Sequence, residues 1–340
     1  MARAQNYRPS QDVYVAYQKE TTVGTAPDHA GLTQLQTTSF TIPEASVPVE
    51  YSAQRSGLYT QTASQGHHSE GTKLWTFDTV LRGTTTSVLL ACESVFEDGA
   101  SECELNNTYS FPIASYRVDS GSSVNTYDIR FVNAGAKDNI ESVIASGCVA
   151  TGFTLTQDIG SEGGELVCTI NWATGFKPTM IGDDLTSGSY DTGTPKNIRN
   201  LAAGSTYVND GSAEELVVQS WELSVNRTIE RIHYKDTTSG TFAPFGYSMT
   251  GGFEVTGNLN VIRNEDIYDI HDAGKFRDST TVAINIAESS GFAIAIPKAF
   301  LNEPSIDNGG AVLMESLPFT VVGDDDISSA SKMLGVTISG

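Results

Sequence analysis

The two halves of this 340-residue chain repeat one order of strand-like and helix-like segments. Residues 39–42 (Ser-Phe-Thr-Ile) resemble residues 220–223 (Ser-Trp-Glu-Leu), an offset of 181 positions between residue 39 and residue 220. Each segment is followed by a polar loop that contains glycine, then by an amphipathic strand, a short helix and further strands. The repeat predicts two copies of a β-domain. Duplicated domains suit a closed ring, which then needs half as many subunits.

The predicted domain boundaries follow periodicity and composition. Residues 1–34 are expected to form a polar N-terminal arm, 35–177 a first domain and 214–340 a second domain. Residues 178–213 are rich in Gly, Asp, Ser, Thr and Asn, which predicts a linker or a long crossing loop. Strands are predicted at 35–43, 72–82, 109–118, 124–132, 147–158, 165–173, 216–226, 252–262, 280–287, 291–296, 316–322 and 333–339.

Alternation of apolar and polar residues defines the clearest strands. In 216–226, Trp221, Leu223 and Val225 alternate with polar residues, and 252–262 repeats the pattern. Such alternation is typical of antiparallel sheets that have one face in water. Pro297 is expected to end the strand before it, because proline cannot donate a hydrogen bond to a neighbouring strand.

A short helix is predicted in each copy. The first is 86–96, with an apolar stripe formed by Leu89, Cys92 and Phe96. The second is 264–276, where Asn264 is the expected N-cap and one side carries Ile267, Ile270 and His271. The predicted fold is therefore all-β with short helices, arranged as two tandem β-sandwich or half-barrel domains, each with one flanking helix.

The charge balance argues against DNA binding through the phosphates. The formal net charge is −21, whereas duplex DNA itself carries about one negative charge per ~1.7 Å of its axis. Solubility or a salt-adapted source would explain the acidity equally well. No apolar run is long enough to span a membrane, and residues 1–7 lack the apolar stretch of a signal peptide. We expect cytosolic synthesis and no membrane partner.

No catalytic or metal-binding pattern is present in the sequence. It lacks a nucleophile elbow and a Gly-rich phosphate loop, and its four cysteines form no C-x-x-C pair. Adjacent His67 and His68 would point to opposite faces of a strand. The acidic runs 183–184 and 324–326 are expected in turns rather than at Ca²⁺ sites. We expect no catalytic residue, no metal and no cofactor, and therefore no enzyme.

Three passages carry a resemblance to a known family. Residues 17–27 (YQKETTVGTAP) resemble the Glu-x-x-x-Gly-Thr-x-Pro start of many members. The second passage is 221–228 (WELSVNRT) followed by 249–259 (MTGGFEVTGNL), and the third is 291–297 (GFAIAIP). In order and spacing these passages resemble the major tail tube proteins of long-tailed, siphovirus-like phages and related archaeal viruses.

The resemblance implies a structural subunit of the virion tail that is synthesised in the host cytoplasm. Tube domains of this family join their neighbours in a continuous barrel around the DNA channel, and members with one domain form stacked hexameric rings. Two domains in one chain imply trimeric rings with pseudo-six-fold symmetry. The implied partners are further copies, other tail proteins at both ends of the tube, and viral DNA that passes through without sequence-specific binding. The loops 44–71 and 227–249 would reach the adjacent ring.

The polar phase of the alternating strands predicts which residues face the lumen of such a tube. An acidic or neutral lumen would offer DNA no contacts that release counterions, so the genome could slide. The predicted lumen-facing residues are Ser220, Glu222, Ser224, Glu254, Thr256 and Asn258, with Ser39 and Thr41 as their first-copy equivalents.

Three other functions are compatible with a β-rich chain. A carbohydrate-binding or adhesin β-sandwich would use exposed loop aromatics such as Tyr51, Tyr59, Tyr190 and Tyr247 to stack on sugars. A β-sandwich hydrolase would need an acid and a base that the sequence does not supply. A capsid or decoration protein would form shells rather than tubes.

Overall fold

The computed structural model describes residues 13–25, 31–44, 49–51, 66–68, 73–96, 102–106, 126–133, 141–182, 188–209, 213–235, 242–277, 280–289, 291–323 and 332–338. The predicted strand 109–118 lies outside these residues, as do the acidic runs 183–184 and 324–326.

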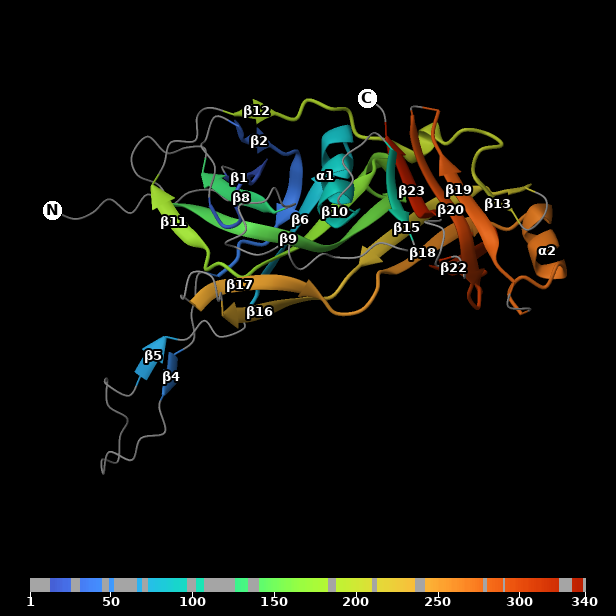
Figure 1. Cartoon of the computed structure of the whole chain (residues 1–340). Helices are drawn as coiled ribbons and strands as arrows, with labels where there is room; N and C mark the ends of the chain where they lie inside the picture. The colour runs from blue at the N-terminus through green and yellow to red at the C-terminus, as the bar shows by residue number, and fades with distance from the viewer. Residues whose placement is uncertain are drawn as a thin grey trace.

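Strands dominate the described chain, which has two α-helices (Figure 1), so the prediction of an all-β protein with short helices is confirmed. The strands of the N-terminal half are β1 (Val13–Lys19), β2 (Thr33–Gln34), β3 (Thr37–Phe40), β4 (Val49–Tyr51), β5 (Gly66–His68), β6 (Trp75–Arg82), β7 (Glu102–Asn106), β8 (Tyr127–Asn133), β9 (Glu141–Asp158), β10 (Val167–Thr174), β11 (Thr179–Gly182) and β12 (Ser189–Tyr190). Those of the C-terminal half are β13 (Tyr207–Asn209), β14 (Ala213–Glu215), β15 (Val218–Asn226), β16 (Ile229–Lys235), β17 (Phe242–Met249), β18 (Glu254–Ile262), β19 (Val282–Ala287), β20 (Phe292–Leu301), β21 (Ser305–Asp307), β22 (Met314–Val321) and β23 (Lys332–Ile338).

The two halves pair their strands in the same order. In the N-terminal half the order is β2-β1-β8-β9-β10-β6-β3, with every neighbouring pair antiparallel. In the C-terminal half it is β14-β13-β19-β20-β22-β18-β15, again antiparallel throughout. Each half also inserts a hairpin after its last-named strand: β4–β5 after β3, and β16–β17 after β15.

A helix follows the second long strand of each half. Helix α1 (Thr85–Phe96) begins where Thr84 Oγ1 accepts a hydrogen bond from Ser87 N at 3.2 Å. Cys92 and Phe96 of the predicted stripe are buried and Leu89 packs partly buried against the same core, while Leu90, Ala91 and Val95, outside the stripe, are buried as well. The helix packs on more than one side because it lies under strands of both halves.

Helix α2 (Glu265–Asp272) matches its prediction at the N-terminus. Asn264 is the N-cap, since its Oδ1 accepts a hydrogen bond from Ile267 N at 3.1 Å. Ile267 and Ile270 are buried, while His271 is half-buried. The helix ends at Asp272, a few residues before the predicted end.

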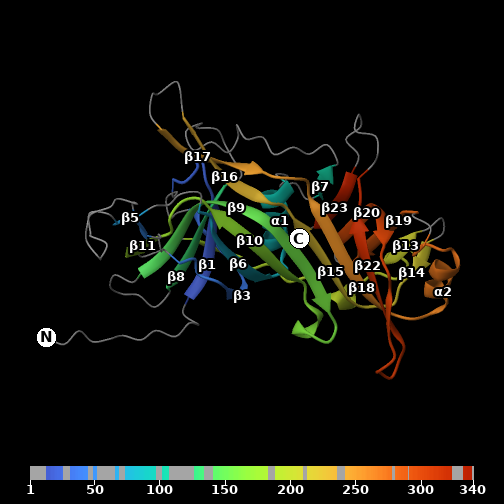
Figure 2. The same cartoon turned by 90° about the horizontal axis from the view of Figure 1, so that it is seen from below.

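The two halves join through one strand pair into a single sheet. The C-terminal part of the long strand β9, residues 152–158, pairs antiparallel with residues 220–226 of β15. Figure 2 shows β9 and β15 side by side between the strands of the two halves. A second link pairs β23 with β7. The backbone of each half is thus hydrogen-bonded to the other.

Two segments differ from their prediction. Residues 178–213, expected as a linker, carry short strands: β11 pairs with β9, β12 with β2, and β13 with β19. Pro297 does not end its strand but lies inside β20, beside a register shift between Ile284 and Val282. A bulge leaves a residue unpaired, so a strand tolerates proline there.

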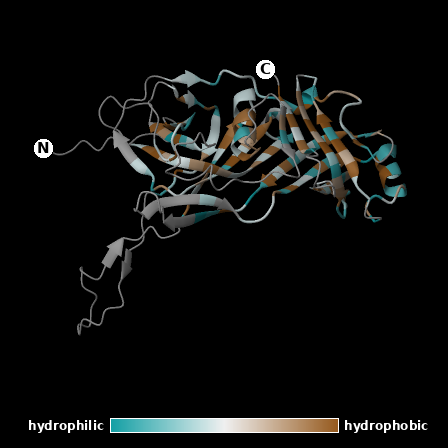
Figure 3. Cartoon of the chain, viewed as in Figure 1, coloured by the Kyte–Doolittle hydropathy of each residue, from teal (hydrophilic) through white to brown (hydrophobic). Residues whose placement is uncertain are grey.

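The apolar faces of the strands and most of α1 form one large core, and Figure 3 shows where the hydrophobic residues lie along these elements. Trp172, Trp221 and Phe153 are among its largest side chains, each at most 2% exposed. Cys92, Cys103, Cys148 and Cys168 are all buried. No helix among the described residues is long and apolar enough to cross a membrane.

Candidate functional site: the polar face of the sheet

The residues predicted to face a lumen lie on one face of one continuous sheet. Hydrogen-bonded pairing runs through β3, β6, β10, β9, β15, β18 and β22 in that order. Thr41 follows β3, and its N–H donates to Asp78 O of β6 at 3.0 Å. The other seven predicted residues lie on the strands themselves: Ser39 on β3, Ser220, Glu222 and Ser224 on β15, and Glu254, Thr256 and Asn258 on β18.

One row of register partners, six of them hydroxyl side chains, crosses all seven strands on this face. Successive partners are in direct register, so their side chains point to the same side of the sheet. All but one member is Ser or Thr, and the row passes from one half to the other at the β9–β15 pair. From edge to edge its residues are Ser39, Val80, Thr169, Thr154, Ser224, Thr256 and Thr320.

Hydrogen bonds between side chains connect neighbouring strands along this face. Thr154 and Ser224 share a hydroxyl hydrogen bond of 3.3 Å across the β9–β15 pair. Farther along, Asn260 donates to Ser220 Oγ at 2.8 Å. Ser316 Oγ of β22 donates to Asn258 Oδ1 at 2.7 Å. These hydrogen bonds between side chains fix the positions of the polar groups on this face without a ligand.

The charged groups of this face are mainly acidic. Asp78 and Glu254 lie in one register row, which runs through Asn171, Gly152 and Asn226. Glu222 lies two residues from the hydroxyl row on β15, and Asp158 is directly opposite Ser220. A shallow groove of ≈ 510 Å³ follows the β9–β15 pair, lined by Thr156, Asp158, Ser220, Glu222, Asn258 and Asn260 among others.

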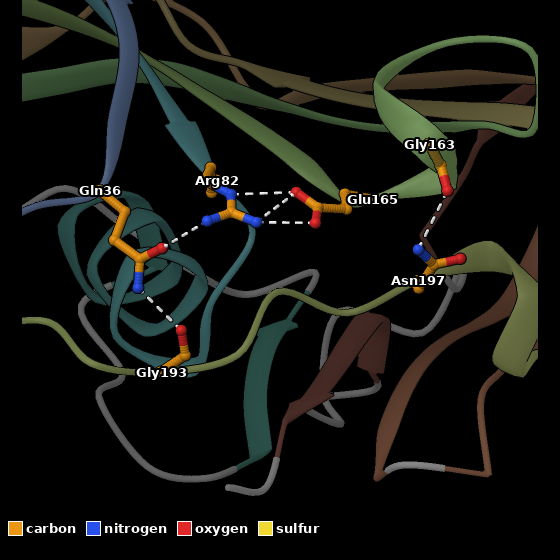
Figure 4. Close-up of polar contacts among 6 residues, drawn as sticks. All are labelled: Gln36, Arg82, Gly163, Glu165, Gly193 and Asn197. Carbon is orange, nitrogen blue, oxygen red and sulfur yellow. Dashed lines mark hydrogen bonds and ion pairs between the residues drawn. The ribbon is translucent and has the colours of Figure 1, made fainter.

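The arginine of this face is paired with a carboxylate, as Figure 4 shows. Arg82 donates to both carboxylate oxygens of Glu165, with Nη2 at 2.7 Å from each, and its Nη1 donates to Gln36 Oε1 at 3.1 Å. Gln36 in turn donates to Gly193 O at 2.8 Å, and Asn197 to Gly163 O at 3.2 Å. These contacts tie the segment after β12 to the first half and neutralise the guanidinium.

The opposite face of the β9–β15 pair is buried. Leu223 is directly opposite Leu155, and both are at most 1% exposed. Trp221 Nε1 donates to Gln157 Oε1 at 2.7 Å, and Gln157 Nε2 donates to Glu288 Oε1 at 2.7 Å. On this side the β9–β15 junction is apolar, and the polar groups of Trp221 and Gln157 within it are hydrogen-bonded. The two halves therefore share a packed, buried interface.

The sheet has the features of a wall: long, antiparallel, polar on one side and joined edge to edge by backbone pairing. The profile of the phage tail tube protein family matches residues 10–321. The chain belongs to the phage tail tube protein family. It is a structural protein of the virion tail, as members of this family are. A comparison with curated proteins finds no match.

For this tail tube protein, sequence reasoning missed the part of the polar face that other strands supply. Thr154 and Thr156 on β9, Thr169 on β10 and Thr320 on β22 belong to the same surface as the predicted residues. The signal was present, because the predicted strands 147–158, 165–173 and 316–322 contain these residues at alternate positions. What the sequence lacked was the register that places them beside β15 and β18.

The aromatic residues considered for sugar stacking do not form one exposed set in the tail tube protein. Tyr247 lies on β17 and is fully buried, so its assignment to an exposed loop is wrong. Its hydroxyl donates to Gly147 O at 2.6 Å and accepts from Gly175 N at 2.9 Å. Tyr190 is exposed on β12, while Tyr59 lies outside the described residues and the side chain of Tyr51 is likewise not described. Within the described residues no three His, Cys, Asp or Glu side chains gather as a metal site.

Proposed function

We propose that this protein is the major tail tube subunit, and that three copies close into a ring around the channel for the genome. Rings would stack into a tube, bounded at both ends by other tail proteins. The observation that carries the proposal is the uninterrupted polar face from β3 to β22, which crosses both halves of the chain at the β9–β15 pair. The protein acts as a wall, without catalysis.

We treat the chain as two tandem tube domains, 35–177 and 214–340; residues 178–213 join them and also supply β13 to the second set of strands. Support comes from the identical pairing order of the two sets of seven strands. A ring of three such chains would have pseudo-six-fold symmetry. The N-terminal arm, 1–34, supplies β1 and β2 to the first set.

Strand number supports assembly rather than a channel within one chain. A closed barrel of about eight strands has an interior filled by its own side chains, whereas barrels of about 16 strands or more leave an aqueous channel. One chain supplies β3, β6, β10, β9, β15, β18, β22 and β21 to the sheet. Three chains would supply about 24 strands, enough for a water-filled lumen.

The chemistry of the polar face supports passage of DNA without adhesion. Protein–DNA affinity depends mainly on Lys and Arg that displace counterions from phosphates. The face instead carries hydroxyls and amides together with Asp78, Asp158, Glu222 and Glu254, and its Arg82 is paired with Glu165. We expect Ser39, Thr41, Ser220, Glu222, Ser224, Glu254, Thr256 and Asn258 to face this lumen.

Negative-stain electron microscopy of the purified, concentrated protein tests this function. Class averages viewed down the axis should show hollow rings or tubes with three-fold symmetry and six lobes. Rings with six copies of the chain, or closed shells, would contradict the trimeric tube. Duplex DNA at low salt should not be retained by the tubes; retention that weakens steeply with salt would contradict the neutral-to-acidic lumen.

A further inference from the structure

Within the part of the chain that the structure describes, the intrachain β9–β15 junction has two counterparts without a strand partner, one at each end of the sheet. One counterpart is β3, which corresponds to β15. Both strands pair with a long strand and shift register at the same point, between Thr37 and Ser39 in β3 and between Val218 and Ser220 in β15. The offset is 181 residues, so Ile42 corresponds to Leu223.

The other counterpart is the β20–β21 segment, which corresponds to β9. Cys148 of β9 and Ala299 of β20 lie at the same register shift against β8 and β19, an offset of 151 residues. The offset persists into β21: Thr156 is opposite Val167 of β10, and Asp307 is opposite Met314 of β22. Two independent pairings therefore place Ile306 at the position of Leu155.

Exposure distinguishes the paired junction from its counterparts. Leu155 and Leu223 face each other in direct register and are 0% and 1% exposed. Their counterparts, Ile306 and Ile42, are 51% and 43% exposed. Large aliphatic side chains thus occupy the same position at both ends of the sheet, but no described strand covers them as the internal pair is covered.

Phe300 is a second exposed apolar residue whose counterpart in the other half is buried. Val149 of β9 is buried beneath Ile229 and Tyr247 of the β16–β17 hairpin. With the offset of 151 residues, its counterpart is Phe300 of β20, which is 36% exposed. The hairpin that corresponds to β16–β17 is β4–β5, and in Figure 1 it projects away from the body of the molecule. The exposed Phe300 and the hairpin that would cover it are therefore both present, at opposite ends of one chain.

We infer that the β21 edge of one chain pairs antiparallel with the β3 edge of a second copy, in the register of the β9–β15 junction. Asp307 then lies opposite Thr41, Ile306 opposite Ile42, and Ser305 opposite Pro43 of the second copy. The β4–β5 hairpin of that copy covers Phe300. This inference rests on the proposed function and specifies the residues at which the ring closes. Because the two edges differ, the contact is heterologous and generates a ring or a helix rather than a two-fold dimer.

The backbone of β3 suits this pairing. Successive N–H groups of a strand point to opposite edges, and Thr41 N donates to Asp78 O of β6. The N–H of Ile42 therefore points to the outer edge, while Pro43, which has no N–H, occupies a position whose donor would face β6. At the internal junction, Arg227 N donates to Thr151 O and Ile159 N to Gln219 O, which places Leu223 and Leu155 in a hydrogen-bonded pair. Ile42 therefore matches Leu223: its backbone N–H points to the edge at which the second strand would pair.

A disulfide between copies tests the register. In the inferred pairing, Thr41 and Asp307 form a non-hydrogen-bonded pair with Cα atoms about 4.5 Å apart, within the range that a disulfide spans. We would combine Thr41→Cys with Asp307→Cys in one chain and oxidise it mildly. The matched control combines Thr41→Cys with Ser305→Cys, two residues out of register. The four existing cysteines are buried, so they do not compete.

Non-reducing electrophoresis and electron microscopy of the same sample separate the outcomes. The in-register pair should give reducible dimers and trimers with about ten-fold more covalent product than the control, because diagonal residues lie ~7–8 Å apart. If rings or tubes form without this cross-link, or if the control pair links as efficiently, the inferred register is wrong. The proposed tube function would not be affected by that result. Failure to form rings and cross-links in all variants would overturn both.

Discussion

Glu20 is a buried carboxyl that holds three segments together. It accepts hydrogen bonds from Gly24 N at 2.8 Å, from Gly147 N at 2.7 Å and from Thr126 Oγ1 at 2.8 Å, and it is 2% exposed. Desolvation outweighs these three donors and raises the pKa of the Glu20 carboxyl to about 7. The folded chain therefore holds a proton at Glu20 at pH values where the unfolded chain has released it.

The raised pKa predicts a specific pH dependence of stability. Between the ordinary value of 4.5 and about 7, the folded state binds more protons than the unfolded state, so the free energy of unfolding falls as pH rises through this window. Glu20→Gln removes the titration. The free energies of unfolding from urea titrations at pH 5 and pH 8 should differ less for the variant than for the unmodified protein, by at most about 3 kcal/mol. An identical pH dependence in both proteins would contradict the assignment.

Arg227 hydrogen-bonds the second half of the chain to helix α1 and to β9. It follows β15 and is 4% exposed, and its guanidinium donates to the carbonyl oxygens of Ala150, Ser94 and Val95 at 2.9–3.1 Å. Cations near the last carbonyls of a helix are favourable. Arg227→Ala leaves these buried acceptors unpaired and should lower the free energy of unfolding by about 2–4 kcal/mol. Arg199→Ala, at an exposed position, is the control and should have little effect on the urea midpoint.

At the scale of elements, Gly257 sets how closely β18 approaches its neighbours. A Cβ added at Gly257 would lie 2.2 Å from Cζ of Phe319 and 2.5 Å from Glu222 O. Gly257→Ala should therefore destabilise the sheet by about 1–3 kcal/mol through overpacking. Gly252→Ala, where nothing lies within 4 Å of the added atom, is the matched control. Equal thermal midpoints for the two variants would show that β18 can shift to accommodate the methyl group.

Local pattern was sufficient for most elements of this fold. Strands such as β15 and β18 expose one face, so alternation in 216–226 and 252–262 predicted both the strands and the polar residues Glu222 and Thr256. The N-cap of α2 was predictable because Asn264 bonds within its own turn. All of these signals lie within a few residues of one another in the chain.

Long-range pairing was not predictable from the same patterns. The place of Thr154 and Thr169 in the hydroxyl row depends on the register of β9 with β10 and β15, which no local feature specifies. The burial of Leu90, Ala91 and Val95 beside the predicted stripe of α1 depends on strands of both halves, and Pro297 was misjudged because the bulge in β20 depends on β19. The short strands of 178–213 take their pairing from distant partners rather than from their own composition.

At the scale of the whole molecule, the two ends of the sheet decide whether chains assemble. Ile42 is 43% exposed at one end, and Ile42→Asp would place a charge opposite the apolar partner that we infer for it. The variant should fold with unchanged circular dichroism but fail to form rings at concentrations where the unmodified protein forms them, because a buried unpaired carboxylate is strongly unfavourable. Tyr268→Asp on α2, at a position 60% exposed, is the control and should assemble normally. Normal rings from Ile42→Asp would contradict the edge contact.

The most direct test of the central claim is a cryo-electron microscopy reconstruction of the assembled tube at a resolution that shows side chains. We expect three chains per ring, with the row from Ser39 through Thr154 and Ser224 to Thr320 lining the lumen. A map that places this row on the outer wall, or that builds the lumen from other strands, would contradict it.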